Sequence, residues 1–171
     1  MPESFSSGSA GAVASDIFLY VKTKRAGKIK GEALAPDHAD DIVVRAWAWG
    51  VSAASAIGSG QATARRAYKH LTVVKGIDSA STGLLSALAT NDEVKEARLA
   101  MRKAGDAQVD YFAVVLGGAR LAAIDIDVDD AGTPVERVQF SFTKVDVEYR
   151  RQESSGQAGA SSLFSDEVLT R

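Results

Sequence analysis

The sequence predicts a mainly β protein, folded as an antiparallel barrel or sandwich with one short α-helix. Several runs alternate apolar and polar residues with the period of a half-buried strand, as in 93–103 and 121–129. In the last long run, apolar side chains occupy even positions over 138–142 but odd positions over 145–149. Because side chains alternate strictly along a strand, this change requires a bulge or a switch between sheets near Thr143. Long strands that change partners are typical of barrels.

Both tryptophans lie in one apolar run, residues 40–52. A period of two places Trp47 and Trp49 on the same face of a strand. Two indoles on one face bury about 150–250 Å² each, so we expect a central strand that anchors the core. The tryptophan face is expected to carry Val43, Arg45 and Val51, and the opposite face carries Ile42, Val44, Ala46, Ala48 and Gly50.

The remaining runs complete the predicted elements. Residues 16–21 suit a buried strand and residues 64–76 suit a second one. A helix is expected to begin at Asp78 or Ser79, which can cap it, and to end near Asn91. Residues 109–116 are apolar on both faces, which indicates burial by a second sheet or by another subunit. The predicted core residues are Phe18, Trp47, Trp49, Leu99, Phe140, Phe142 and Tyr149.

The length of 171 residues fits one domain. We expect a flexible Ser/Gly/Ala-rich N-terminal arm over residues 1–15, a β-barrel domain over 16–151 and a polar C-terminal tail over 152–171. The N-terminus lacks a cationic segment followed by a continuous apolar run, which a cleaved secretory signal would require. Synthesis and folding in the cytoplasm are therefore expected.

Composition excludes several function classes. Twenty basic against 22 acidic residues give a net charge of −2, so nothing global favours nucleic acid or an anionic membrane as a partner. The sequence contains no cysteine, which removes disulfides, thiol nucleophiles and cysteine-type zinc sites. No phosphate-binding loop is present, because Gly58-Ser59-Gly60 is not followed by Gly-Lys-Ser/Thr.

Three alternatives to a structural protein follow from single features. His38 and His70 are the available neutral-pH bases, so a small hydrolase on a β scaffold would use one of them, although no Gly-x-Ser-x-Gly elbow accompanies them. A monomeric ligand-binding β-barrel would instead need a ligand-sized pocket. The third alternative is a calcium loop, because carboxylates at positions 1, 3, 5 and 12 have the required spacing: Asp125, Asp127, Asp129 and Glu136. Against calcium, the sixth position is Asp130 rather than glycine, and an acidic strand face explains the same spacing.

A series of short motifs occurs in a fixed order over residues 16–150. In this order they resemble the haemolysin-coregulated protein (Hcp) family, which builds the inner tube of bacterial type VI secretion systems. This sequence has Ala48 between the tryptophans where the family usually has Ser, and Thr82 where it has Pro. The motifs are Asp16-Ile17-Phe18-Leu19, Ile29-Lys30-Gly31-Glu32, His38, Trp47-Ala48-Trp49-Gly50-Val51-Ser52, Ile77-Asp78-Ser79-Ala80-Ser81, Arg102-Lys103-Ala104-Gly105 and Val135-Glu136, before a strand that finishes at Tyr149.

The resemblance implies a hexameric ring that stacks into a tube inside a contractile sheath and is expelled with its spike. Such rings can also carry small effector proteins in the lumen. It further implies a structural protein rather than an enzyme, with no cofactor, secreted by the type VI apparatus without a cleaved signal peptide.

Two surfaces are expected to carry the contacts between subunits. The resemblance assigns contact between stacked rings to the small-residue loop after the tryptophans, represented by Ala53, Ile57, Gly58, Ser59, Gly60 and Ala62. Cationic and acidic segments in a nearly neutral sequence suit a head-to-tail ring, in which one surface of a subunit meets a different surface of the next. The candidate residues for that interface are Lys28, Lys30, Arg65, Arg66, Asp125 and Asp127.

Overall fold

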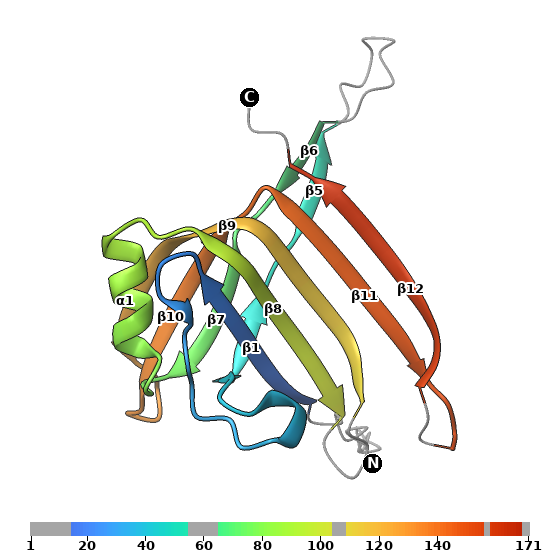
Figure 1. The fold of residues 1–171 in the computed structure, drawn as a ribbon, viewed down its shortest axis with the longest axis horizontal. Helices are drawn as coiled ribbons and strands as arrows, with labels where there is room; N and C mark the ends of the chain where they lie inside the picture. The colour runs from blue at the N-terminus through green and yellow to red at the C-terminus, as the bar shows by residue number, and fades with distance from the viewer. Residues whose placement is uncertain (1–14, 55–64, 104–108, 156–157, 169–171) are drawn as a thin grey trace, which may run out of the picture.

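The fold is mainly antiparallel β with one short α-helix, as the sequence predicts (Figure 1). The computed structural model describes residues 15–54, 65–103, 109–155 and 158–168. Within these ranges, no helix is long and apolar enough to cross a bilayer. The elements are β1 (Ser15–Thr23), β2 (Gly27–Lys28), a 3-10 turn η1 (Pro36–His38), β3 (Ile42–Val44), β4 (Ala46–Ala48), β5 (Val51–Ala54), β6 (Arg65–Tyr68), β7 (Leu71–Gly76), α1 (Ser81–Ala89), β8 (Val94–Lys103), β9 (Asp110–Val128), β10 (Pro134–Ser141), β11 (Lys144–Gln152) and β12 (Ala158–Glu167).

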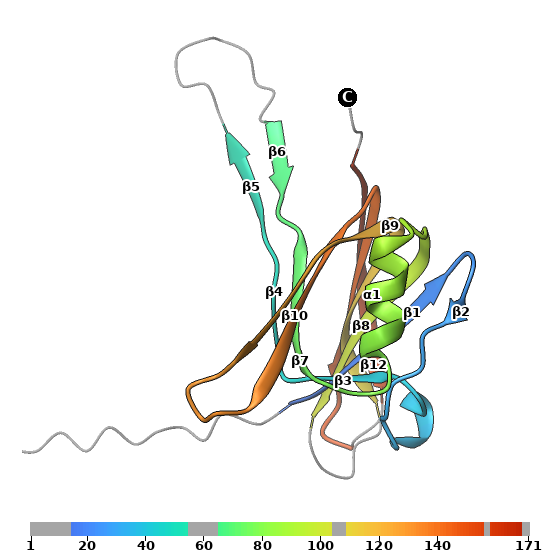
Figure 2. The same cartoon turned by 90° about the vertical axis from the view of Figure 1, so that its left-hand side faces the viewer.

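Antiparallel pairing closes these strands into a barrel. β1 pairs with β8, β8 with β9, β9 with β10, β10 with β7, and β7 with β4. The path returns to β1 through β3, which pairs with β1 and is joined to β4 at Arg45. Figure 2 shows the two layers edge on, with β4, β7 and β10 in one layer and β1 and β8 in the other. Apolar side chains of both layers fill the space between them.

The tryptophan run forms three short strands, so the prediction of one central strand is wrong. β3 pairs with β1 in one layer and β4 pairs with β7 in the other, so the chain changes layer at Arg45. The buried positions change parity there: Val44 is buried on β3, whereas Trp47 and Trp49 pack against the core from β4 onward. Alternation over 46–49 places the indoles inward as expected, but it does not continue across a layer change.

β9 is the longest strand and serves both layers. Its first half pairs with β8 and β11, and its second half pairs with β10. At the change of partners, Gly118 has φ +53°, and a Cβ atom there would lie 2.1 Å from Thr143 Oγ1, so glycine is required. The switch predicted near Thr143 is confirmed, because β10 ends at Ser141 and β11 begins at Lys144 beside a different part of β9.

The core contains most of the predicted aromatic and aliphatic residues. Phe18, Leu99, Phe140 and Phe142 are buried. Leu84 and Ala87 turn from α1 into the same cluster. The helix begins at Ser81 with Ala80 at the N-cap and no side-chain cap, so the predicted cap by Asp78 or Ser79 is wrong; Asp78 Oδ1 instead accepts from the backbone N–H of Ala80 at 2.9 Å in the preceding turn. The helix ends before Asn91, which has φ +51°.

The last two strands, β11 and β12, form a flange that extends from the barrel (Figure 1). The sequence predicts a polar tail after residue 151, but residues 158–167 form β12 and pair with β11. Tyr149, predicted in the core, is 48% exposed. It lies opposite Phe112 near the start of β9, where the barrel no longer covers that face of β11. We call β11 and β12 the flange below.

Candidate assembly surfaces

His38 is held on both sides by carboxylates, which makes it a structural residue. Its Nδ1 lies 2.9 Å from Asp41 Oδ2 and its Nε2 lies 2.9 Å from Asp110 Oδ1. The ring stacks on Phe18 with 4.4 Å between centroids. These contacts fasten the η1 segment to the start of β9. Because neither ring nitrogen is left to accept a proton from a nucleophile, His38 has no catalytic geometry.

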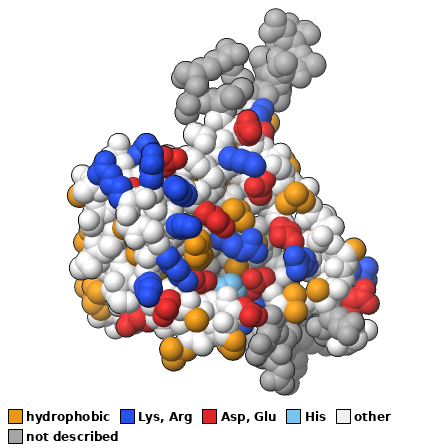
Figure 3. Space-filling model, in the orientation of Figure 1, with side chains coloured by type: hydrophobic (Ala, Val, Ile, Leu, Met, Phe, Trp, Pro, Cys, Tyr) orange, Lys and Arg blue, Asp and Glu red, His pale blue; other side chains and the backbone are white. Residues whose placement is uncertain are grey.

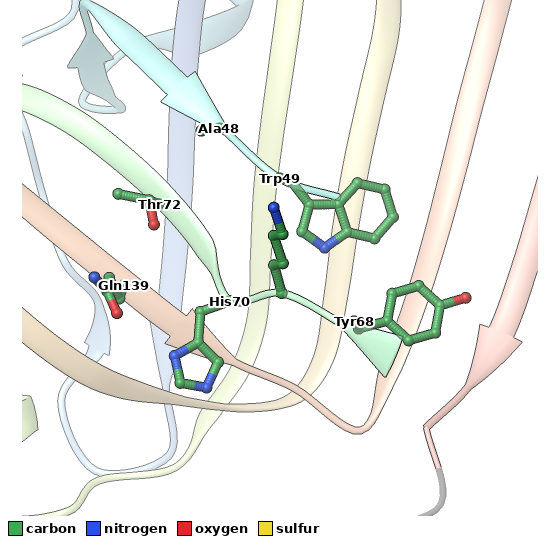
Figure 4. Close-up of a pocket in the computed structure, with 7 residues that line it drawn as sticks. Ala48, Trp49, Tyr68, His70, Thr72 and Gln139 are labelled. Atoms are coloured by element: carbon green, nitrogen blue, oxygen red, sulfur yellow. The ribbon is translucent and has the colours of Figure 1, made fainter. Parts of the chain in front are cut away.

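His70 lines a shallow groove of about 450 Å³ on the outer face of β7 and β10. Trp49, Tyr68, Thr72 and Gln139 line the same groove. Figure 4 shows the His70 ring pointing away from Trp49 and Tyr68. No carboxylate is among the groove's described lining residues, so nothing there orients His70 as a catalytic base. The groove does not support the hydrolase alternative.

The four carboxylates of the calcium alternative do not converge. Within the described ranges no group of three or more acidic or histidine side chains could hold a metal ion. Glu136 points into the protein and is 1% exposed, whereas Asp125 and Asp127 lie on the exposed end of β9. The carboxylate of Asp129 instead accepts hydrogen bonds from backbone N–H groups within its own turn.

Glu136 belongs to a buried ionic network that the sequence analysis missed. It pairs with Lys75, which is 0% exposed and lies directly opposite it in the register of β7 and β10. Lys75 Nζ also lies 2.9 Å from Asp78 Oδ1, and Ser81 Oγ donates to Glu136 Oε2 at 2.9 Å. Alternation could have found the pair, because it places Lys75 on the same face as Leu71 and Val73. The network joins the two strands to the start of α1.

The outer face of the β1–β8–β9–β11 sheet carries interspersed charges of both signs (Figure 3). On this face, Asp16 lies 3.8 Å from Arg102 between Oδ2 and Nε, and Glu148 accepts a 2.8 Å hydrogen bond from Arg150. Because both signs alternate on this face, it offers no uniformly positive surface that would attract a polyanion.

The six charged residues expected at a subunit interface are spread over several elements. Lys28 lies 2.8 Å from Asp41 and above the ring of Tyr20, and Lys30 is exposed. Asp127 accepts a 2.6 Å hydrogen bond from Arg137, and this contact raises the pKa of the Arg137 guanidinium. Asp125, its neighbour on β9, is exposed.

The other two members of that set, Arg65 and Arg66, begin β6. Arg66 binds Asp166 on the flange through two hydrogen bonds, whereas the side chain of Arg65 lies outside the described residues. Thus Arg66 and Asp127 already have partners in their own chain.

The β5–β6 hairpin stands away from the barrel (Figures 1 and 2). Its two strands pair only with each other among the described elements. Ala53 lies exposed on β5. The other residues predicted for ring stacking, Ile57, Gly58, Ser59, Gly60 and Ala62, lie outside the described residues.

The flange exposes apolar side chains on both of its faces. Leu163 is 71% exposed and Phe164 is 49% exposed, and neighbours in a strand point to opposite faces. No residue of β12 is buried. The far edge of β12 has no strand partner among the described residues. A strand that is exposed on both faces and along one edge is typical of a surface covered by another molecule.

Together, a closed barrel, a protruding hairpin and an uncovered flange are typical of a structural protein that assembles with copies of itself. The family model described as "Type VI secretion system effector, Hcp" matches residues 18–149, so the chain belongs to the Hcp family. Its sequence is 28% identical over 148 residues to Protein hcp1 of Pseudomonas aeruginosa, covering 84% of this chain and 88% of that protein.

Solved structures agree with this assignment. The crystal structure of Hcp1 from Salmonella typhimurium is 25% identical, with a TM-score of 0.73 over 91% of this chain and 95% of that one. A structure described as a type six secretion system protein has a TM-score of 0.80 at 22% identity, over 91% and 96% of the two chains, and supports the fold alone. The protein is a type VI tube subunit that forms hexameric rings and is structural rather than enzymatic.

Proposed function

We propose that these rings stack into an expelled tube, and that the flange closes each ring while the β5–β6 hairpin joins successive rings. The observation that supports this division is that other elements of the described chain leave most of both surfaces uncovered. The flange leaves both faces and an edge uncovered, and the hairpin extends beyond the barrel. A ring requires a heterologous contact, so the flange of one subunit packs on a different surface of the next.

The wider assembly follows from the same proposal. The tube lies in a contractile sheath, carries a spike and leaves the cell through the type VI apparatus. Small effector proteins travel in its lumen. This route requires no membrane-spanning helix and no catalytic site.

Replacing Leu163 with Asp tests the role of the flange. A charge at the centre of an apolar contact should prevent ring closure, because burying an unpaired carboxylate is costly. Light scattering should then show an 18.0 kDa species with an unchanged circular dichroism spectrum. Leu34, which is also exposed but lies outside the flange, supplies the control variant Leu34→Asp, which should still form rings.

Shortening residues 53–62 to a tight turn tests the role of the hairpin. Electron microscopy should show intact single rings and few tubes, because the barrel strands are unchanged. Folded monomers from this variant would instead assign the hairpin to ring closure. Rings of Leu163→Asp that match those of the unaltered protein would exclude the flange from the subunit interface.

A further inference from the structure

Asp166, near the end of β12, contacts the base of the β5–β6 hairpin. Arg66 donates from Nε to Asp166 Oδ2 at 2.5 Å and from Nη2 to Oδ1 at 2.8 Å. The hydroxyl of Tyr68 donates to the same Oδ2 at 2.6 Å. Two residues of β6 therefore converge on one carboxylate that is about a hundred positions away in the sequence. Paired hydrogen bonds of this kind fix orientation as well as distance.

The same contacts influence the ionisation of all three groups. The hydrogen bonds from Arg66 and Tyr68 hold the pKa of Asp166 below its usual value. Asp166 in turn raises the pKa of Arg66, while burial and the hydrogen bond to Asp166 raise the pKa of the Tyr68 hydroxyl. The folded geometry thus favours an ionised Asp166 beside two proton donors.

The described chain sets the direction of the hairpin at its base. β5 and β6 continue from β4 and β7 as a separate two-stranded sheet, and at the junction the backbone N–H of Lys69 donates to the carbonyl of Gly50 at 2.9 Å. At its base, Tyr68 stacks on Trp49 at 5.8 Å and meets the buried ring of Phe142 edge on at 5.8 Å. Further from the barrel than Tyr68, the described side chains of the hairpin are exposed. The direction of the hairpin therefore depends on its contacts at the base. From the flange, these are the hydrogen bonds to Asp166 and a longer one from Arg66 to the carbonyl of Glu167 at 3.3 Å.

The flange end that carries Asp166 is itself fixed to the barrel. The backbone N–H of Val168 donates to the carbonyl of Thr143 at 2.6 Å, and Val168 packs against the core. Asp166 also lies opposite Val145, which is fully buried. The position of the Asp166 carboxylate therefore depends on how well β12 is ordered.

We infer that Asp166 is a positioning residue that couples the hairpin to the flange, so that rings close before they stack. The inference rests on the proposed function of these two surfaces. In a subunit whose flange is not yet covered by a neighbour, no residue of β12 is buried, so β12 and its Asp166 are less firmly placed than in a closed ring. Covering the flange orders Asp166, which then orders the hairpin for contact with the next ring.

Asp166→Ala tests the coupling, with Asp146→Ala as a matched control. Asp146 lies on β11 opposite Ser165, and its ion-pair partner among the described residues is Lys144, at 3.9 Å, so its loss changes the charge of the flange but not the hairpin. In isolated rings, we expect hydrogen exchange of the β6 amides to be roughly three- to tenfold faster in Asp166→Ala. Trp49 emission should also shift, measured in a Trp47→Phe background. The control should match the unaltered protein in both.

A second variant asks whether the two residues act as a pair. Arg66→Gln should speed β6 exchange by no more than Asp166→Ala does, because Tyr68 still contacts Asp166, and the double variant should be no faster than Asp166→Ala alone. Additive effects would overturn the inference, as would unchanged exchange in Asp166→Ala.

Failure of the proposed function would give a different result. Hydrogen exchange of the β6 amides in isolated rings measures the order of the hairpin and does not depend on stacking. If exchange rises in Asp166→Ala and tubes become fewer, both proposals are supported. If exchange rises but tubes form normally, Asp166 positions the hairpin while stacking does not depend on it, and the order of assembly inferred above is overturned.

Discussion

β8 and β12 are both ten-residue strands, yet they form in opposite environments. β8 lies between β1 and β9 and buries Val94, Ala97, Leu99 and Ala100. β12 has one partner strand and buries no residue. The barrel strand is stabilised by its side chains, whereas the flange strand is stabilised by its backbone ladder with β11. The comparison shows that β12 gains little side-chain burial within its own subunit, which a neighbouring subunit supplies in the proposed ring.

Phe140→Ala should have the largest effect, because Phe140 lies fully buried in the barrel. Loss of the ring and the cavity that it leaves should lower the free energy of unfolding by about 4 kcal/mol. Urea denaturation followed by circular dichroism measures the change. A loss below 1 kcal/mol would mean that the barrel can repack around this position.

Lys75→Met should follow, with a loss of about 3 kcal/mol, because it leaves Glu136 and Asp78 without their buried cation. The same denaturation experiment applies. Its control is the double variant Lys75→Met/Glu136→Leu, which removes both charges and should recover most of the loss. A double variant as unstable as the single one would show that packing, not the unpaired charge, causes the effect.

Acid should weaken the contact between the flange and the hairpin. The pKa of Asp166 is lowered by its hydrogen bonds from Arg66 and Tyr68, so the folded state favours the ionised form. Its contribution is therefore complete above the ordinary carboxyl pKa of about 3.9 and is lost as the pH falls through the lower folded value. We expect the difference in β6 hydrogen exchange between the unaltered protein and Asp166→Ala to shrink from pH 5 towards pH 2. A difference that stays constant over this range would contradict the assignment.

Leu163→Ala should have the smallest effect, within about 0.5 kcal/mol for the monomer, because the side chain is mostly exposed. The matched substitution in the barrel is Leu99→Ala, which should cost about 2–5 kcal/mol. Melting temperatures of both variants, measured at a concentration that keeps the chains monomeric, give the contrast. Equal losses would mean that the flange packs on the barrel more closely than its exposure indicates.

The barrel strands could be predicted because their apolar residues repeat with the period of the pleat. β8 and the change of sheets near Thr143 are examples. β12 has no such repeat, since Ser161 and Ser162 precede adjacent apolar residues at Leu163 and Phe164. Its existence depends on pairing with β11, which no local pattern encodes.

The contacts between distant residues were harder to predict from the sequence than the strands. The parity of β7 already places Lys75 inward, and the carboxylate opposite it could have been sought on a neighbouring strand. Arg66 and Asp166 offered no equivalent signal, because both are polar residues in exposed strands, about a hundred positions apart. Only the fold brings them together.

The pairing of β1 with β8 also has a consequence during synthesis on the ribosome. Phe18 pairs with Ala100, so about eighty further residues must be synthesised before β8, the longest partner of β1, is available. At 5–20 residues per second, the delay is roughly 4–16 s. Until then β3 is the longer of its available partners, and that pairing spans only Ile17 to Leu19. The nascent chain therefore carries an apolar strand that is largely unpaired until β8 emerges, and segments of this kind are prone to aggregation during synthesis.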